Sequence, residues 1–262
     1  MPELPEVETF KRYIERTSLE KVVVKAEVKN PVVVRPARPE DVVRAVEGSE
    51  FLSVRRHGKQ LFLELGQGGW MTWHFGMTGE PVFFDRPSEE PRFDRFLLTF
   101  EHGRLAFDDP CMLGRIGVTP SPEEFIERKR LGEDALSVAE KRFVDLMERS
   151  RGSVKNALMD QHKIAGVGNI YADEVLFQCR IDPRAEVSSL DNADLKCMHR
   201  SMKRVLRRSI EVGTDFAQLP KTYLLHYRRK GAPCPKCGGV MDTVTLGGRT
   251  SYFCPSCQGR GR

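Results

Sequence analysis

The sequence predicts an α+β protein in which a strand-rich first half is followed by a helical second half. Residues from about 21 to 109 contain short β-branched or aromatic runs between turn residues, a pattern typical of a sandwich or a barrel. After residue 120 the apolar residues recur at helical spacing. Two Cys-x-x-Cys pairs near the end of the chain define a third, smaller part.

The composition indicates a soluble protein with sizeable cores. The chain has 262 residues, of which 40% are hydrophobic and 30% charged, enough for one large domain or two with an appendage. No apolar run reaches the length of a membrane span, and the N-terminus lacks the pattern of a secretory signal. We therefore expect a cytoplasmic protein without a membrane partner, and, since no oligomer seam is visible, a monomer.

The strand-rich half begins with a helix from Glu6 to about Arg16, in which apolar residues recur at helical spacing. The predicted strands that follow are Val22–Val24, Val32–Val34, Leu61–Leu63 and Phe96–Phe100, with a hairpin turn at 101–104.

In the helical half, Ser137 and Glu140 have the spacing of a capping box. Helices are expected at 154–160, 169–179 and 192–212. The longest should bury a stripe made of Leu195, Met198, Met202, Val205 and Ile210.

Four cysteines have the spacing of a structural zinc site. Cys234-x-x-Cys237 and Cys254-x-x-Cys257 are separated by sixteen residues. Four thiolates at this spacing bind Zn²⁺ tetrahedrally on a β-hairpin and leave no open position for catalysis. Arg249 lies in the hairpin turn, where it would face a ligand. The remaining cysteines are interpreted as ordinary buried thiols: Cys111, Cys179 and Cys197.

The end of the chain is basic. From Pro220 onward Asp242 is the only acid, against eight lysines and arginines that include Arg260 and Arg262. Nucleic acid is the simplest polyanion for such a segment, although a solvated basic tail fits the charge equally well.

The first residues, Met1-Pro2-Glu3, contain the groups needed for amine chemistry. Pro2 is small enough for Met1 to be removed, which leaves a secondary amine. An α-amino group has a pKa of about 8, so an unprotonated fraction can attack a carbonyl-type carbon at neutral pH. Glu3 can move the protons. A frayed terminus without a function fits these residues alone equally well.

Glycine-punctuated turns provide further candidates. Residues 55–59, Arg-Arg-His-Gly-Lys, form a basic loop that either contacts phosphate or is simply solvated. Met77 stands between Gly76 and Gly79, as a packing residue or as a wedge in a base stack. The turn that ends in Asn169 opens a helix, whose exposed N–H groups and positive end suit a DNA phosphate.

Together these segments resemble the formamidopyrimidine-DNA glycosylase / endonuclease VIII (Fpg/Nei) family of base-excision repair enzymes. The resemblance covers nearly the whole chain. It rests on Pro2–Glu8, Gly58-Lys59, His74–Met77, Asp109-Pro110, Leu158–Gln161, Gly166–Glu174 and the cysteine pairs. It implies an N-terminal β-sandwich with a leading helix (1–120), a helix–two-turn–helix domain (121–226) and a four-cysteine zinc finger (227–262).

The resemblance also implies a bifunctional DNA glycosylase and AP lyase with one structural Zn²⁺. Pro2 would attack C1′ of a damaged nucleotide, displace the base and form an imine, after which β,δ-elimination cuts the strand. Glu3 would protonate the sugar ring oxygen, Glu6 would assist, and Lys59 would lie beside the lesion. The implied DNA-binding residues are Lys155, Asn169, Arg249, Met77 and Leu113. DNA, as damaged duplex or single strand, is the implied partner, and a prokaryotic member would be associated with the nucleoid.

Two departures from the family members that excise 8-oxoguanine argue against 8-oxoguanine as the preferred lesion. The family segment Asp-Pro-Arg-x-Phe-Gly reads here as residues 109–114, Asp-Pro-Cys-Met-Leu-Gly, which lacks the arginine that reads the opposite base. The lesion-covering loop at 213–227 is also short. We therefore expect a preference for oxidised pyrimidines, abasic sites or single-stranded DNA. A non-catalytic DNA-binding protein on the same scaffold, and a zinc-ribbon adaptor, are the rival interpretations.

Overall fold

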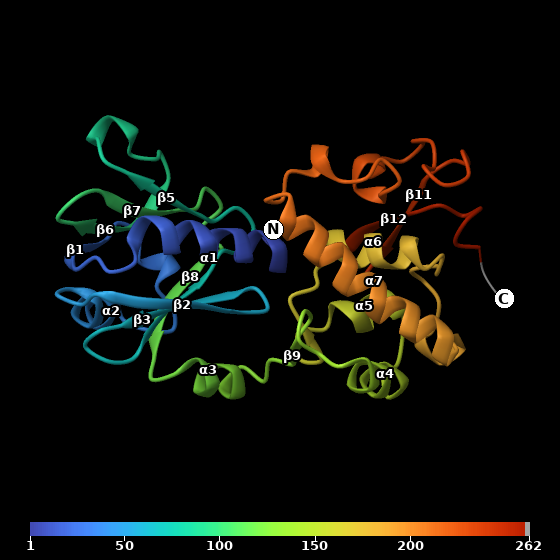
Figure 1. Cartoon of the computed structure of the whole chain (residues 1–262), viewed down its shortest axis with the longest axis horizontal. Coiled ribbons are helices and arrows are strands. Elements are labelled where there is room, and N and C mark those ends of the chain that lie inside the picture. The colour runs from blue at the N-terminus through green and yellow to red at the C-terminus, as the bar shows by residue number, and fades with distance from the viewer. Residues whose placement is uncertain (260–262) are drawn as a thin grey trace. The chain divides into compact units, whose positions relative to one another are not determined.

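The computed structural model describes residues 1–259, and the chain forms two compact units (Figure 1). The first unit consists of residues 1–2 and 6–130, and the second of residues 3–5 and those from 131 onward. Each unit has its own hydrophobic core. Within the described residues, no helix combines the length and the apolarity needed to cross a membrane.

The first unit contains two four-stranded antiparallel sheets preceded by a helix. Helix α1 (Leu4–Ser18) buries Val7 and Ile14 completely. One sheet has the order β1-β6-β7-β5 and the other β2-β3-β4-β8. Both contribute to a core around Trp73, Phe75 and Phe107. The predicted sandwich with a leading helix is confirmed. Its strands are β1 (Val23–Val28), β2 (Phe51–His57), β3 (Gln60–Leu65), β4 (Trp70–His74), β5 (Glu80–Phe84), β6 (Asp94–Phe100), β7 (Arg104–Asp108) and β8 (Arg115–Thr119).

The predicted strand at Val32–Val34 is wrong. Pro31–Val33 is a 3₁₀ turn (η1), because Pro31 has no N–H to give to a sheet and the side chain of Asn30 accepts the N–H of Val32. The sequence interpretation also overlooked helix α2 (Pro39–Val46), which begins with a proline and two acidic residues, as helices often do. Helix α3 (Pro122–Arg128) and η2 (Pro87–Glu89) complete the unit.

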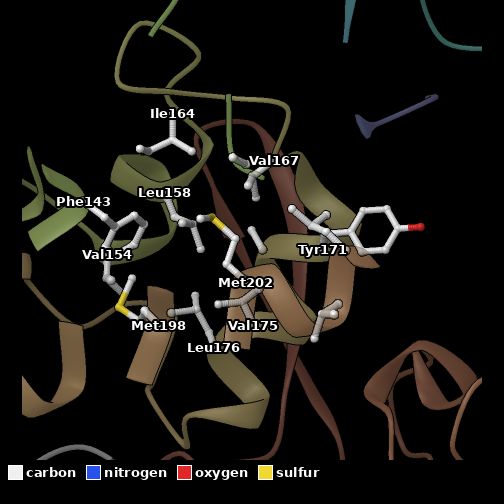
Figure 2. Packing of buried hydrophobic residues seen from close by; sticks show 14 of the residues in the cluster. Phe143, Val154, Leu158, Ile164, Val167, Tyr171, Val175, Leu176, Met198 and Met202 are labelled. Atoms are coloured by element: carbon white, nitrogen blue, oxygen red, sulfur yellow. The ribbon is translucent and has the colours of Figure 1, made fainter. Parts of the chain in front are cut away.

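The second unit is a helical domain with a terminal hairpin. Figure 2 shows its core, in which Leu158, Tyr171, Val175, Met198 and Met202 meet. All five residues of the predicted α7 stripe are buried. The elements are β9 (Glu133–Asp134), α4 (Glu140–Glu148), α5 (Val154–Met159), β10 (Ile164–Ala165), α6 (Asn169–Gln178), η3 (Val187–Ser189), α7 (Asn192–Glu211), η4 (Phe216–Gln218), η5 (Leu224–Tyr227), β11 (Asp242–Leu246) and β12 (Arg249–Phe253).

Two sequence predictions fail in this unit. Ala139 is the N-cap residue of α4, and the hydroxyl of Ser137 donates to the carbonyl of Asp134, so there is no capping box. Cys179 and Cys197 form a disulfide that joins the C-terminal end of α6 to α7. They are therefore not free thiols, since the packing of α6 against α7 brings the two residues together.

The prediction for Cys111, in the first unit, is also wrong, because Cys111 is a free but exposed thiol rather than a buried one. Of the basic terminal residues, Arg260 and Arg262 lie outside the described residues.

Candidate active site

The carboxylate of Glu3 is held by the first turn of α6. Its Oε2 accepts the N–H of Gly168 at 2.7 Å and its Oε1 that of Ile170 at 2.8 Å, and a longer contact of 3.4 Å reaches the N–H of Tyr171. Only 1% of Glu3 is exposed. A helix leaves its first N–H groups without partners and has a positive N-terminal end, and both features stabilise a carboxylate there.

The helix end that was predicted to bind a DNA phosphate is therefore occupied by the protein's own carboxylate, and that prediction is wrong. Gly168 explains the close approach. Its φ of −127° is open to any residue, but a Cβ at this position would lie 2.3 Å from Cδ of Glu3. A glycine is thus required here by the space that Glu3 takes, and not by the backbone angle.

Pro2 precedes Glu3 directly and is half-buried. Since consecutive Cα atoms are about 3.8 Å apart, residue 2 is joined directly to the residue whose carboxylate α6 holds in place. Glu6 is also half-buried, in the first turn of α1.

Lys155 is fully buried in a polar cluster. Its Nζ lies 2.5 Å from Oδ1 of Asp173, 2.5 Å from Oγ of Ser251 and 2.7 Å from Oδ1 of Asn169. The other oxygen of Asp173 lies 2.5 Å from the guanidinium of Arg228. Burial lowers the pKa of Lys155, and Asp173 opposes this shift. An ammonium engaged in this way holds Asn169 at the start of α6 and Ser251 of β12 in place.

Asn169 and Arg249 are brought together by the same cluster. The side-chain amide of Asn169 donates to the carbonyl of Thr250 at 3.1 Å, and Arg249, the residue before it, is exposed at the start of β12. The start of α6 and the terminal hairpin thus form one polar surface. Both predicted phosphate contacts lie on it.

In the first unit, Lys59 occupies the tip of the β2–β3 hairpin. Gly58 has a φ of +55° and Lys59 has no positive φ, which is the φ pattern of a type II′ turn. The adjoining strand register pairs Gln60 with His74 and His74 with Arg115. Lys59, His74 and Arg115 therefore lie at one end of this sheet.

His74 is a polar residue that was not among the predicted catalytic or DNA-binding residues. Burial is the largest cause of a lowered pKa at His74, and together with the nearby charges of Lys59 and Arg115 it brings the pKa to about 4. Its Nδ1 accepts the N–H of Gly76 at 3.2 Å. A neutral ring with an accepting Nδ1 carries its proton on Nε2, so His74 offers one N–H donor beside Lys59. The sequence did not reveal this role, because the strand register that places His74 there is not visible in it.

Met77 and Leu113 lie on two loops that touch. Their side chains are 53% and 47% exposed, which is rare for large apolar residues in this chain. Gly76 makes the contact possible, since a Cβ there would lie 2.4 Å from the backbone carbon of Leu113. Buried Asp109 fixes the second loop by accepting the N–H of Gly114 at 2.7 Å. The two candidate wedges thus lie on adjoining loops of the first unit.

The four terminal cysteines can bind a metal ion. All their Sγ atoms lie within 4.8 Å of one another, and two pairs are 3.6 Å apart. Tetrahedral zinc with bonds of about 2.3 Å requires sulfur atoms about 3.8 Å apart. The residues therefore fit Zn²⁺ and supply all four of its ligands: Cys234, Cys237, Cys254 and Cys257.

Three family models match the chain in order. The formamidopyrimidine-DNA glycosylase N-terminal domain matches residues 1–116, the H2TH domain of the same enzyme matches 131–220, and the zinc finger found in FPG and IleRS matches 231–259. This set of domains is that of a DNA glycosylase of base excision repair. The chain belongs to the Fpg/Nei family.

Individual relatives agree over nearly the full length. Formamidopyrimidine-DNA glycosylases from Synechocystis and Streptococcus mutans are 34% and 32% identical, over 98% of this chain and 98% and 99% of theirs. The solved complex of Lactococcus lactis Fpg with DNA containing an abasic site has a TM-score of 0.90 at 25% identity, covering 98% of this chain and all of that one. The complex of the wild-type L. lactis enzyme with N7-benzyl-Fapy-dG DNA gives 0.90 at 26%, covering 99% and 100%.

Proposed function

We propose that the chain excises damaged bases with Pro2 as nucleophile and then cleaves the strand as an AP lyase. The observation that carries this proposal is the fixed carboxylate of Glu3 next to a residue that becomes a secondary amine once Met1 is removed. A protein that only bound DNA would have no chemical use for this pair.

In the proposed reaction, the proline ammonium first gives a proton to the Glu3 carboxylate. This transfer produces a free amine and a carboxylic acid together. The amine nitrogen forms a bond to C1′ as the C1′–base bond breaks, and the base departs with its electron pair. The bonded nitrogen gives its remaining proton to the departing base. Glu3 then protonates the ring oxygen, the C1′–O4′ bond opens as the nitrogen lone pair joins C1′, and an iminium ion forms. Loss of a C2′ proton and successive β- and δ-eliminations then release both phosphates.

The second unit supplies the DNA contacts in this proposal. Asn169 and Arg249 would each bind a phosphate, and Lys155 would position Asn169. One structural zinc would hold the hairpin that carries Arg249. Met77 and Leu113 would enter the stack when the lesion leaves it.

We further propose that oxidised pyrimidines, abasic sites or single-stranded DNA are favoured over 8-oxoguanine. The loop at 109–114 has no side chain that reads a base as arginine does, and its exposed residues are Pro110, Cys111 and Leu113. The segment 213–227, where a lesion cover would lie, is anchored to the core by buried Leu219, Tyr223 and Leu225.

Borohydride trapping on a duplex with one abasic site tests the chemistry. The protein is prepared with an N-terminal extension, and half of it is cleaved so that Pro2 becomes the first residue. A covalent adduct in the cleaved half alone is expected, and Pro2→Gly tests the contribution of the proline ring. No adduct from a zinc-loaded protein with a verified proline terminus would favour the non-catalytic DNA-binding alternative.

Lesion preference is tested separately, with single-turnover excision of 8-oxoguanine and of an oxidised pyrimidine in the same duplex. Faster excision of the pyrimidine lesion is expected. A strong preference for 8-oxoguanine would refute the proposed lesion preference without affecting the proposed role of Pro2 in catalysis.

A further inference from the structure

The exposed face of α7 carries a row of basic residues that the proposed reaction does not use. Arg200, Lys203, Arg204 and Arg207 follow the i, i+3, i+4, i+7 spacing of one helix face. The opposite face is buried in the core of the second unit, through residues such as Met198, Met202 and Val205. We name these four cations the α7 row.

The α7 row is not neutralised by the protein. Within residues 1–259, none of the four cations has a carboxylate at ion-pair distance, whereas Arg38, Arg86 and Arg142 elsewhere on the surface all do. Burial lowers the pKa of Lys203, Arg207 lowers it further, and the more distant Asp134 opposes them. Cations packed side by side in this way repel one another unless an anion joins them.

The row lines an open groove of about 600 Å³. Two carboxylates, Glu140 and Glu211, also line it, but Glu211 pairs with Arg208 at 3.2 Å and Glu140 faces His199 at 3.8 Å. The groove therefore keeps an excess of positive charge.

The row is separate from the surface of Asn169 and Arg249. Helix α6 lies between α7 and β12 (Figure 1). The face of α7 that packs on the core contains Met198, Met202 and Val205. The α7 row faces away from that core, and the groove that it lines includes neither Asn169 nor Arg249.

We propose that the α7 row is a second, sequence-independent binding surface for the backbone of duplex DNA. From Arg200 to Arg207 the helix rises about 10.5 Å, and the same length of duplex carries about six phosphate charges. A protein partner would require apolar anchors at the centre of its interface. Among the described residues, no large exposed apolar side chain lies on α7. Cations without apolar anchors suit a phosphate backbone.

The test uses zinc-loaded protein saturated with a short duplex that contains a stable abasic analogue, so that the lesion-binding surface is filled. A labelled lesion-free duplex is then titrated by fluorescence anisotropy between 50 and 200 mM salt. The test variant carries Arg200→Gln, Lys203→Gln and Arg207→Gln, and keeps Arg204 because its guanidinium also donates to Ser201.

The matched control carries Arg38→Gln, Arg44→Gln and Arg86→Gln, three exposed cations that are ion-paired in the first unit. It loses the same net charge. We expect the wild-type and control complexes to bind the second duplex with equal salt dependence. In the α7 variant the slope of log affinity against log salt should be smaller by about 2.7, since each phosphate contact contributes about 0.9.

Three results would overturn the proposal. They are a wild-type complex that binds no second duplex, an α7 variant with an unchanged salt slope, and a control whose salt slope decreases as much as that of the variant. If polyglutamate binding depends on the α7 row and duplex binding does not, an acidic protein is the partner instead. Excision of a lesion at saturating enzyme should be the same in all three proteins, because the row does not touch the reacting groups.

Discussion

Gly168→Ala should dislodge the proposed catalytic acid without touching it chemically. The φ of −127° lets alanine adopt the same backbone, but its Cβ would lie 2.3 Å from Cδ of Glu3, where ordinary contacts are 3.4 to 4 Å. The carboxylate must leave the end of α6. It then loses its two short hydrogen bonds, to the N–H groups of Gly168 and Ile170.

A hydrogen bond to a charged group contributes about 1.5–3 kcal/mol, and adjacent losses are not additive, so the free energy of unfolding should fall by about 3 kcal/mol. Misplacing a catalytic group by about 1 Å can cost roughly 100-fold in rate. We therefore expect single-turnover excision to slow by about two orders of magnitude, with DNA affinity almost unchanged.

Gly66→Ala is the matched control, because its nearest neighbours would lie 3.6 Å from the new Cβ. Both substitutions affect the unfolded chain equally. Urea denaturation gives the stability and rapid-quench excision gives the rate. If Gly168→Ala equals Gly66→Ala in both measurements, the idea that α6 positions the Glu3 carboxylate is refuted.

Three further predictions concern other parts of the site. Lys155→Met should weaken duplex binding about tenfold, because it frees Asn169 from its partner. Excision at saturating enzyme should slow much less. An equal loss in both measurements would contradict a positioning role. Cys257→Ser should lower the bound zinc, measured by mass spectrometry, and reduce duplex affinity, whereas Cys111→Ser, at a free exposed thiol, should retain one zinc per chain. The pKa of His74 is lowered to about 4 in the folded protein, from 6.5 in the unfolded chain. Between these pH values the unfolded state binds more protons, so the free energy of unfolding decreases as the pH falls from 6.5 to 4. The loss should be about 2–3 kcal/mol. Denaturation at pH 7 and pH 4.5 should show this loss for the wild type and not for His74→Gln. If both proteins lose the same stability between the two pH values, His74 is not buried in its neutral form.

Local patterns predicted the parts of this protein whose cause is local. The period of apolar residues predicted α6 and α7, because one helix face must be buried. Cysteine spacing predicted the metal cluster, since two short hairpin turns suffice to bring four sulfur atoms together. The order of short motifs predicted the family.

Contacts between distant segments were beyond the sequence. The pattern of Gly168 and Asn169 indicated an anion site, but nothing local showed that the anion is the carboxylate of Glu3, from the other end of the chain. The family resemblance implied that Lys155 binds DNA, whereas in the folded protein its buried ammonium lies against Asn169. Packing of α6 against α7 likewise decided that Cys179 forms a disulfide.

The sequence by itself therefore determined the family, the order of the domains and the residue types available for catalysis. The tertiary structure alone decided which helix end holds Glu3 and which cations are buried. It also decided which cations, like those of the α7 row, have no carboxylate at ion-pair distance within residues 1–259. The physical reason is that ionic and hydrogen-bonding partners are chosen by distance in space, and strand register and helix packing, which set those distances, depend on the whole core.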